Sequence, residues 1–360
     1  MNDCMGGKIM DAVRIGIIGL GGISNKHIRE LLDCKNAAIT AVCDIDEVKL
    51  KEKGEQLGLD EAHRFRDYHD LIACKDVDAV EICTPNHLHV SMALDVVREG
   101  KKLNVEKPLA LTVEDAKLLA DELEKRNMEA MMCFSWRFHP AVLYAKKLLE
   151  DGVIGDILDI EVAYLKDSAL WPGRKLEWRF VKEYAGTGAL GDLGVHLIDM
   201  ARYLIGDFKS VCGRLRTVVQ ERPRLDGEGM GKVETDDHAS FLAELDGGVN
   251  AVFNITRAAY GHGNTIRFDI HGMEGTISFN LNHPEKLGIG CAKMFPEYPQ
   301  LHEIDVPEGY RVIQEQTFAD FAQKGEKGRL FPSVQDGVAC QKILAAIERS
   351  AKEKCWVDVE

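Results

Sequence analysis

The stretch VRIGIIGLGGIS, residues 13–24, joins a short apolar run to a cluster of glycines. Its first half is mostly apolar and β-branched, which is typical of a strand buried on both faces of a sheet. The glycines that follow allow a tight turn and a close approach of the backbone at the start of a helix. The stretch therefore predicts a strand, a glycine turn and a helix, the opening of a βαβ unit.

The same alternation of apolar runs and helical patterns continues to residue 134. The expected strands are Val13–Gly19, Ala37–Cys43, Val77–Cys83, Leu103–Glu106 and Glu129–Phe134, with helices at Asp46–Leu57, His87–Glu99 and Val113–Arg126. Strands that alternate with helices indicate a parallel sheet with crossover helices. We therefore expect residues 1–134 to form an α/β domain of the doubly wound, Rossmann type.

After Pro140 the pattern changes to helices followed by successive long strands. The expected elements are helices at Ala141–Asp151, Leu193–Leu204, Tyr310–Lys324 and Ser333–Lys352, and strands at Ala239–Leu245, Val249–Thr256, Thr265–His271 and Thr276–Asn280. The Asp246-Gly247-Gly248 turn is typical of a hairpin. Because 360 residues exceed one compact core, we expect a second, α+β domain over residues 135–360, with a large, mostly antiparallel open sheet.

The composition favours a small-molecule partner in the cytoplasm. A formal charge of −14 disfavours nucleic acid and anionic membrane surfaces as partners. No apolar run approaches the roughly 18 residues of a membrane span, and residues 1–11 lack the apolar core of a signal peptide. The ten cysteines stand singly, which favours buried thiols over disulfides or ligands.

The glycine stretch and a later aspartate indicate a dinucleotide site. Gly19, Gly21, Gly22, Ile23 and Ser24 form the turn and helix start where a pyrophosphate is held in such units. Asp44 ends the next expected strand, where a carboxylate accepts bonds from the adenosine ribose and repels a 2′-phosphate, so NAD is favoured over NADP. Two alternatives are a glycine turn that holds nothing, and an Asp44 or Asp46 that only caps the following helix.

Three further polar segments lie at or near expected strand ends. They are Cys83–His89, Asn104–Pro108 and Gly188–Asp199, and in the last of these Asp192 and His196 stand four residues apart, on one face of a helix. Packing alone does not require this polarity at these places.

Together these motifs resemble the Gfo/Idh/MocA family, the relatives of glucose-fructose oxidoreductase and inositol dehydrogenase. The resemblance extends from Val13 to about Val359, and its most specific elements are Glu106-Lys107-Pro108 and the run from Asp192 through Gly194 and His196 to Asp199. Ser24 at the end of the fingerprint and Gly186-Thr187-Gly188 before the helix depart from the family pattern, but neither changes a reacting group.

The resemblance implies roles for individual residues. It makes Lys107, Asp192 and His196 the catalytic group, with Lys107 facing both nicotinamide and substrate. It implies a cofactor cleft lined by Thr84, Pro85, Asn86, His89, Glu106 and Lys107 in addition to the glycine turn and Asp44. It also implies a homodimer or homotetramer formed through the open sheet, a face that the few helices of the second half leave uncovered.

The implied reaction explains these residue types. Oxidation of a secondary alcohol sends a hydride to the nicotinamide and a proton to a base, and the imidazole of His196 suits proton transfer near neutrality. Lys107 would stabilise negative charge on the reacting oxygen, and Asp192 would orient the imidazole or bind a second hydroxyl. Each residue alone also has an ordinary structural interpretation: a cap, a buried histidine and a solvated lysine.

The segment before the catalytic helix suggests the substrate. Trp171 and Trp178, with Arg174 between them, combine aromatic faces and a charge suited to a sugar, inositol or glycoside, although the tryptophans could instead anchor a long loop. With Lys107, Asp192 and His196 they form the expected substrate site. We expect no metal, since His87 and His89 lack further ligands nearby. The alternatives to an NAD-dependent dehydrogenase are a glycosidase that retains NAD and a non-catalytic NAD-binding sensor.

Overall fold

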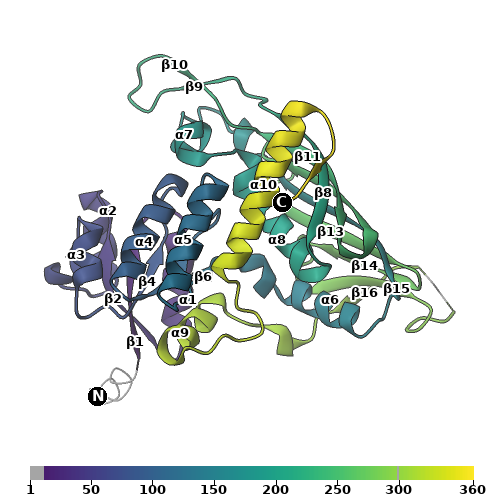
Figure 1. The fold of residues 1–360 in the computed structure, drawn as a ribbon, viewed down its shortest axis with the longest axis horizontal. Helices are drawn as coiled ribbons and strands as arrows, with labels where there is room; N and C mark the ends of the chain where they lie inside the picture. The colour runs from purple at the N-terminus through teal and green to yellow at the C-terminus, as the bar shows by residue number, and fades with distance from the viewer. Residues whose placement is uncertain (1–11, 298–299) are drawn as a thin grey trace. The chain divides into compact units, whose positions relative to one another are not determined.

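The computed structural model describes residues 12–297 and 300–360, which divide into two compact units. The first unit runs to Phe134 and also contains Val312–Val338, whereas the second contains Ser135–Arg311 and Ala339–Glu360. Figure 1 shows the order of the elements along the chain. The expectation about a signal peptide concerns residues 1–11, which lie outside the described residues. None of the described helices is both long enough and apolar enough to span a membrane.

The first unit is a Rossmann-like domain built on a six-stranded parallel sheet of order β3-β2-β1-β4-β5-β6. The strands are β1 (Val13–Ile18), β2 (Ala37–Cys43), β3 (Arg64–Phe65), β4 (Ala79–Ile82), β5 (Lys102–Val105) and β6 (Met131–Met132). The helices of residues 12–134 are α1 (Ser24–Asp33), α2 (Glu47–Gln56), α3 (Tyr68–Ala73), α4 (His89–Arg98) and α5 (Val113–Lys125). In such sheets ligands bind beyond the carboxyl ends of the strands where the order reverses, here at β1 and β4.

The expected α/β architecture of this half is confirmed, with two small additions. The short strand β3 and helix α3 were not expected from the sequence, because two and six residues give too little periodicity to recognise. Helices α4 and α5 pack beside each other (Figure 1). The sheet interior is mostly apolar, and β1 contributes Ile15 and Ile17 to the fully buried core, while β4 and β5 each bury one polar side chain, Glu81 and Asn104.

The structure divides the chain differently from the two consecutive domains expected. The break at Phe134 coincides with the expected one, but the segment 312–338 packs with the first unit. Helix α9 (Gln314–Lys324) contacts α1, β1 and β5, and the Met132 N–H donates to the Pro332 carbonyl at 2.8 Å. The chain thus returns to the first unit because α9 covers apolar surface that the sheet leaves open there.

The second unit contains a nine-stranded sheet of order β16-β15-β14-β13-β7-β12-β11-β8-β17, in which only β7 and β12 pair in parallel. Its strands are β7 (Ile157–Lys166), β8 (Phe208–Arg216), β11 (His238–Leu245), β12 (Val249–Thr256), β13 (Asn264–Gly272), β14 (Gly275–Asn280), β15 (Lys286–Cys291), β16 (His302–Asp305) and β17 (Val357–Asp358). A separate hairpin joins β9 (Glu221–Pro223) to β10 (Met230–Lys232). The expected mostly antiparallel sheet is confirmed.

Helices cover one face of this sheet. They include α6 (Pro140–Glu150), α8 (Val195–Leu204) and the part of α10 (Val334–Glu353) that lies in this unit, whereas the short helix α7 (Lys182–Ala185) contacts the turn Trp178–Phe180. Figure 1 shows α6 and α8 along the sheet, and α8 contacts β7 while α6 contacts β15. Along β11 and β12, buried side chains on this face alternate with more exposed side chains on the other face, as expected of a sheet packed on one side only.

Candidate active site

The glycine turn after β1 has the geometry that a phosphate-binding loop needs. Gly19 has φ +90°, and a Cβ there would lie 2.9 Å from the Cys83 carbonyl carbon, so only glycine fits. By contrast, a Cβ on Gly21 or Gly22 would meet no heavy atom within 4 Å. The first turn of α1 carries no acidic residue, and the Ser24 hydroxyl donates to the Gly21 carbonyl at 2.7 Å. The open side of this turn therefore suits a pyrophosphate at a helix N-terminus.

Asp44 and Asp46 have different roles at the end of β2. Asp46 caps α2, since its carboxylate accepts from the N–H groups of Val48 and Lys49. Asp44 does not cap a helix: its two oxygens accept from the Leu20 N–H at 2.7 Å and the Asp46 N–H at 2.9 Å. Asp44 thus holds a carboxylate directly beside the glycine turn, where an adenosine ribose fits. The alternative in which Asp44 is only a helix cap is removed.

The segment after β4 is fixed by a histidine whose ring is buried. The two ring nitrogens of His89 lie 2.8 Å from the Pro108 carbonyl oxygen and 2.9 Å from that of Thr84. Burial lowers the pKa of His89, and the neutral ring that this favours can donate to only one of the two carbonyl oxygens. His89 therefore connects the loop at Thr84 to the loop at Pro108, and both ring nitrogens face the protein. Asn86, in the short turn before α4, is buried as well.

Glu106 and Lys107 lie where β5 ends. The Glu106 carboxylate accepts from the Lys107 N–H at 3.0 Å and lies 3.0 Å from the Nε2 atom of His27 on α1. Lys107 is half-buried. Sequence reasoning missed His27, although its position three residues after Ser24, on the helix that opens at the glycine turn, places it toward the sheet.

In the second unit, Asp192 and His196 occupy one continuous helical stretch and are both half-buried. The expected helix is preceded by a π-helical segment, Leu190–Gly194, which carries Asp192, and His196 follows in the first turn of α8. Such widened turns often occur at functional sites. The Arg179 Nε atom lies 4.0 Å from an Asp192 oxygen, and burial, followed by the charge of Asp192, raises the pKa of Tyr164. Arg179 and Tyr164 are neighbours of the expected site that the sequence did not reveal.

A buried carboxylate holds the segment that leads into this helix. Asp236 accepts from the N–H groups of Gly188 at 2.6 Å and Leu190 at 2.8 Å, and burial raises its pKa. A Cβ at Gly188 would overlap the Asp236 backbone, so glycine is required there. Asp236 thus fixes the start of the stretch that carries Asp192.

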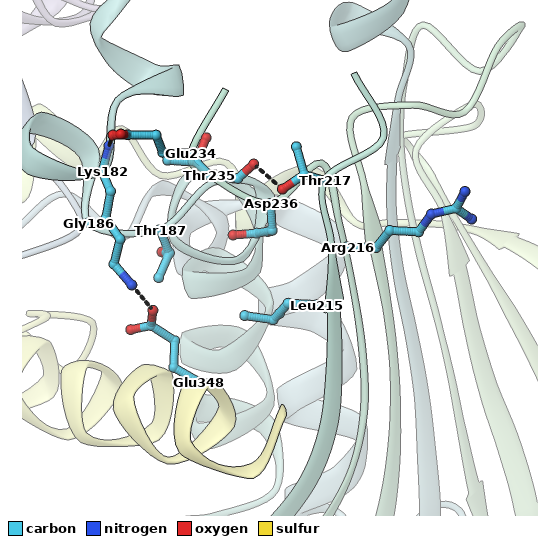
Figure 2. Close-up of a pocket in the computed structure, with 10 residues that line it drawn as sticks. All are labelled: Lys182, Gly186, Thr187, Leu215, Arg216, Thr217, Glu234, Thr235, Asp236 and Glu348. Atoms are coloured by element: carbon cyan, nitrogen blue, oxygen red, sulfur yellow. Dashed lines mark hydrogen bonds and ion pairs between the residues drawn. The ribbon is translucent and has the colours of Figure 1, made fainter. Parts of the chain in front are cut away.

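A pocket of about 160 Å³ lies beside this segment. In Figure 2 Thr187 and Asp236 face it, and Lys182 pairs with Glu348 at 3.0 Å across its side. Neither Asp192 nor His196 lines it, and its volume is below the roughly 300 Å³ of a typical ligand pocket. We therefore do not assign this pocket to the substrate, and it lies next to the residues that hold the start of the helix in place.

The next turn of α8 is anchored by a buried ion pair. The Arg137 guanidinium contacts both oxygens of Asp199 at distances from 2.6 to 3.0 Å, and both side chains are almost fully buried. Asp199, the last residue of the helix motif, therefore fixes the orientation of α8 through its buried ion pair with Arg137.

The expected substrate loop is divided in the structure. Trp171 is exposed and donates to Asp167 at 2.9 Å, and Arg174 binds the Ser168 carbonyl at 2.8 Å. Both line a pocket of about 280 Å³ in which neither Asp192 nor His196 takes part. Trp178 instead carries the guanidinium of Arg179 over its ring at 4.3 Å. Within this loop, Trp178 is thus linked to Asp192 through Arg179.

Potential metal ligands gather in the described residues at three places. Two share His27, one with Glu106 and Cys133 and the other with Glu81 and Cys83, and the third is His63, Cys74 and Asp76. Among the described residues neither His87 nor His89 belongs to such a group.

Comparison with known proteins gives a consistent result. Residues 13–134 match the model of an oxidoreductase family with an NAD-binding Rossmann fold, and residues 142–278 match the GFO/IDH/MocA C-terminal domain. Levoglucosan dehydrogenase of Pseudarthrobacter phenanthrenivorans is 36% identical over 86% of this chain and 88% of its own length. Inositol 2-dehydrogenase of Rhizobium meliloti is 26% identical over 96% of this chain and 99% of its own length. A structure of levoglucosan dehydrogenase with NADH is 31% identical, with a TM-score of 0.90 over 97% of this chain and 99% of that one.

Proposed function

The chain belongs to the Gfo/Idh/MocA family of oxidoreductases, and from this we propose that it is an NAD-dependent dehydrogenase of a sugar, inositol or glycoside. One observation carries the proposal most directly. The match to a dehydrogenase extends over 86% of the chain, and this chain carries both the Glu106-Lys107-Pro108 and the Asp192-to-His196 motifs. The relatives named above are dehydrogenases, so a redox glycosidase and a non-catalytic sensor lack comparable support.

Each unit contributes a part of the proposed reaction. Bound NAD⁺ supplies the acceptor for the hydride. Gly19–Ser24 and Asp44 hold its pyrophosphate and ribose, and Thr84, Pro85, Asn86 and Glu106 line the remaining cleft, with His89 fixing the loops from behind. Asp44 beside the turn disfavours a 2′-phosphate, so NAD is the cofactor rather than NADP.

His196 takes the proton from the substrate hydroxyl, and the imidazole type suits this task near neutral pH. Lys107 binds the same oxygen and stabilises the negative charge that develops there. Asp192, held near Arg179, orients the imidazole or accepts a second hydroxyl of the substrate. The face of the Trp178 ring that Arg179 leaves uncovered would pack against the C–H side of the substrate, while Trp171 and Arg174 line a separate pocket to which neither Asp192 nor His196 belongs.

The structure also suggests an oligomeric state and a cellular location for the protein. We propose a homodimer or homotetramer formed through the open face of the nine-stranded sheet, where Leu242 and Val252 are directly paired and 47% and 41% exposed. We also propose a cytoplasmic location, since the nine cysteines of the described residues are all free, as in a reducing compartment.

A substrate screen tests the proposed function. Purified protein with NAD⁺ is offered sugars, inositols and glycosides, anhydrosugars among them, and the absorbance of NADH is followed with and without each compound. Net NADH formation with one class supports the dehydrogenase. Substrate cleavage without net NADH would support the glycosidase, and NADH binding without turnover on any of these compounds would support the sensor.

A further inference from the structure

Beneath the proposed nicotinamide end of the cofactor site lies a cluster of buried ionisable side chains. His27 is at its centre, with a side chain only 2% exposed. Its Nε2 atom lies 3.0 Å from Glu106, and its Nδ1 atom lies 2.9 Å from Glu315 and 3.2 Å from Glu81. One imidazole thus contacts three carboxylates, all within the first unit.

The cluster is closed by amide and thiol groups. The Asn104 amide donates to Glu81 at 3.3 Å and to Glu315 at 3.4 Å, and the Cys133 thiol donates to the Asn104 oxygen at 3.3 Å. Gln314 donates to Glu315 at 3.1 Å. These neutral donors leave His27 as the cation that faces the three carboxylates.

The ionisable groups of the cluster differ in whether they are charged at neutral pH. Burial, followed by the charge of Glu81, raises the pKa of Glu315 to about 8, so this carboxyl keeps its proton at neutral pH. Burial opposes ionisation of Glu81, but His27 outweighs it and lowers the pKa of that carboxyl. Burial also opposes the charged form of His27, yet the pKa of His27 is raised well above the usual value. Of the acidic neighbours Cys83, Glu315 and Glu81, it is Glu81 that is ionised at neutral pH and can act through its charge. A protonated His27 can therefore donate from Nε2 to Glu106, while its Nδ1 atom lies within ion-pair distance of Glu315 and Glu81 but has no hydrogen-bond partner of good geometry.

Buried ion clusters of this kind are rarely a source of stability, because desolvation offsets most of the attraction. Their position is more informative. His27 lies one turn after the glycine turn, on α1, and through Glu106 it reaches the backbone N–H of Lys107, which the second oxygen of Glu106 accepts at 3.0 Å. The same histidine thus connects the helix at the proposed pyrophosphate end with the residue at the proposed nicotinamide end.

We propose that His27, held by Glu81 and Glu315, is a positioning residue that sets Glu106 and Lys107 against the nicotinamide half of the cofactor. The inference rests on the proposed cofactor site and deepens it. Loss of His27 releases Glu106, so the end of β5 shifts while the glycine turn and Asp44 keep their own bonds. The nicotinamide half then loses its contacts, and the adenosine half retains them.

The test compares two ligands that differ only in the nicotinamide part. Calorimetric titration of the full chain with NADH and with ADP-ribose measures both halves of the site without any substrate. We expect His27→Gln to weaken NADH about tenfold, the equivalent of one charge-assisted hydrogen bond, and to change ADP-ribose less than about twofold. Glu81→Gln removes a negative charge beside the His27 ring. This variant should also weaken NADH more than ADP-ribose, but with a smaller loss of NADH affinity than His27→Gln.

Leu31→Ala is the matched control. Leu31 lies one turn along the same helix and is buried in the core, so its truncation lowers the melting temperature without touching the cluster. We expect the ratio of the two affinities to stay at the wild-type value in this variant. Equal losses of NADH and ADP-ribose in His27→Gln and Glu81→Gln, or no loss in either, would overturn the proposal.

Two further results would distinguish the role of His27 from the proposed substrate class and from metal binding. Selective loss of NADH affinity in a protein that oxidises no sugar or polyol would leave the positioning role intact and refute the proposed substrate class. A stoichiometric metal ion that elemental analysis finds in the wild type and not in His27→Gln would overturn the inference, since His27 would then be a ligand rather than a hydrogen-bonded cation.

Discussion

Two neighbouring aspartates at the end of β2 allow a sharp test of cofactor choice. Asp44→Ser removes the carboxylate beside the glycine turn, so we expect NADH to bind about tenfold more weakly, the scale of one charge-assisted bond, and NADPH to gain relative to it. The loss of an acceptor for the Leu20 and Asp46 N–H groups should also lower stability by about 1–3 kcal/mol. Fluorescence titration with both cofactors and thermal unfolding measure the two effects.

Asp46→Ser is the control for this pair. It retains a capping side chain for α2 and leaves the turn untouched, so the ratio of NADH to NADPH affinity should stay at the wild-type value. Equal affinity of the wild type for the two cofactors would contradict the role given to Asp44.

The proposed base allows a second test at single-residue scale. We expect His196→Ala to reduce kcat by about 10²–10⁴-fold with little change in NAD affinity, because general-base catalysis contributes about that much. The wild-type rate should rise with pH through the histidine range, and the variant should lose this limb. His283→Ala, at an exposed histidine of the same unit, should keep both rate and profile. If His196→Ala keeps an unaltered pH profile on the identified substrate, Lys107 becomes the candidate base.

Local chemistry made some of these residues predictable and left others hidden. The sequence offers Asp192 and His196 as candidates because their spacing places them on one face of a helix. Arg179 and Tyr164 come from a loop and a strand, and no local pattern connects them to Asp192. His27 and Glu315 are 288 residues apart, so only the tertiary fold brings them together.

At the scale of elements, the segment before α8 depends on a single glycine. Gly188→Ala would place a methyl group on the Asp236 backbone, so we expect at least about 3 kcal/mol of destabilisation, measured by denaturant unfolding. Activity should fall as well, since the π-helical segment with Asp192 begins there. Gly309→Ala, in the same unit but with nothing near its Cβ, should change stability by less than about 0.5 kcal/mol. A fully stable Gly188→Ala protein would refute the close approach.

Helix α9 adds a pH-dependent contribution to the first unit through Glu315. Its folded pKa is about 8 against an ordinary 4.5, so between these values the folded chain holds a proton that the unfolded chain has released. The folded state is therefore favoured below about pH 4.5, and this contribution is lost as the pH rises towards 8. We expect Glu315→Gln to gain stability relative to the wild type across this window, and then to keep a constant difference. Melting temperatures of both proteins at several pH values measure this, and parallel curves would contradict it.

The sequence predicted the elements in which an apolar pattern repeats over many residues. It missed elements that are only a few residues long, and it did not reveal that a late segment of the chain packs with the first unit. The parallel sheet and the long antiparallel strands both follow from their apolar patterns. The π-helical turn does not, because Leu190–Gly194 has the same residue types as an α-helix start. The return of residues 312–338 to the first unit also has no local signal, since a helix pattern does not specify the sheet against which it packs.

At the scale of the whole molecule, the open face of the nine-stranded sheet predicts the assembly. Leu242 and Val252 lie opposite each other on neighbouring strands and remain exposed, and a second copy is the partner that a sheet packed on one side only would bury there. Light scattering of the wild type at micromolar concentration should give a dimer or tetramer. Leu242→Glu should give a monomer, because it places a charge in the centre of the apolar contact. Leu118→Glu, at an equally exposed leucine on α5 of the first unit, should keep the wild-type mass. A monomeric wild type would contradict the assembly, whereas an oligomeric Leu242→Glu protein would move the interface to another surface.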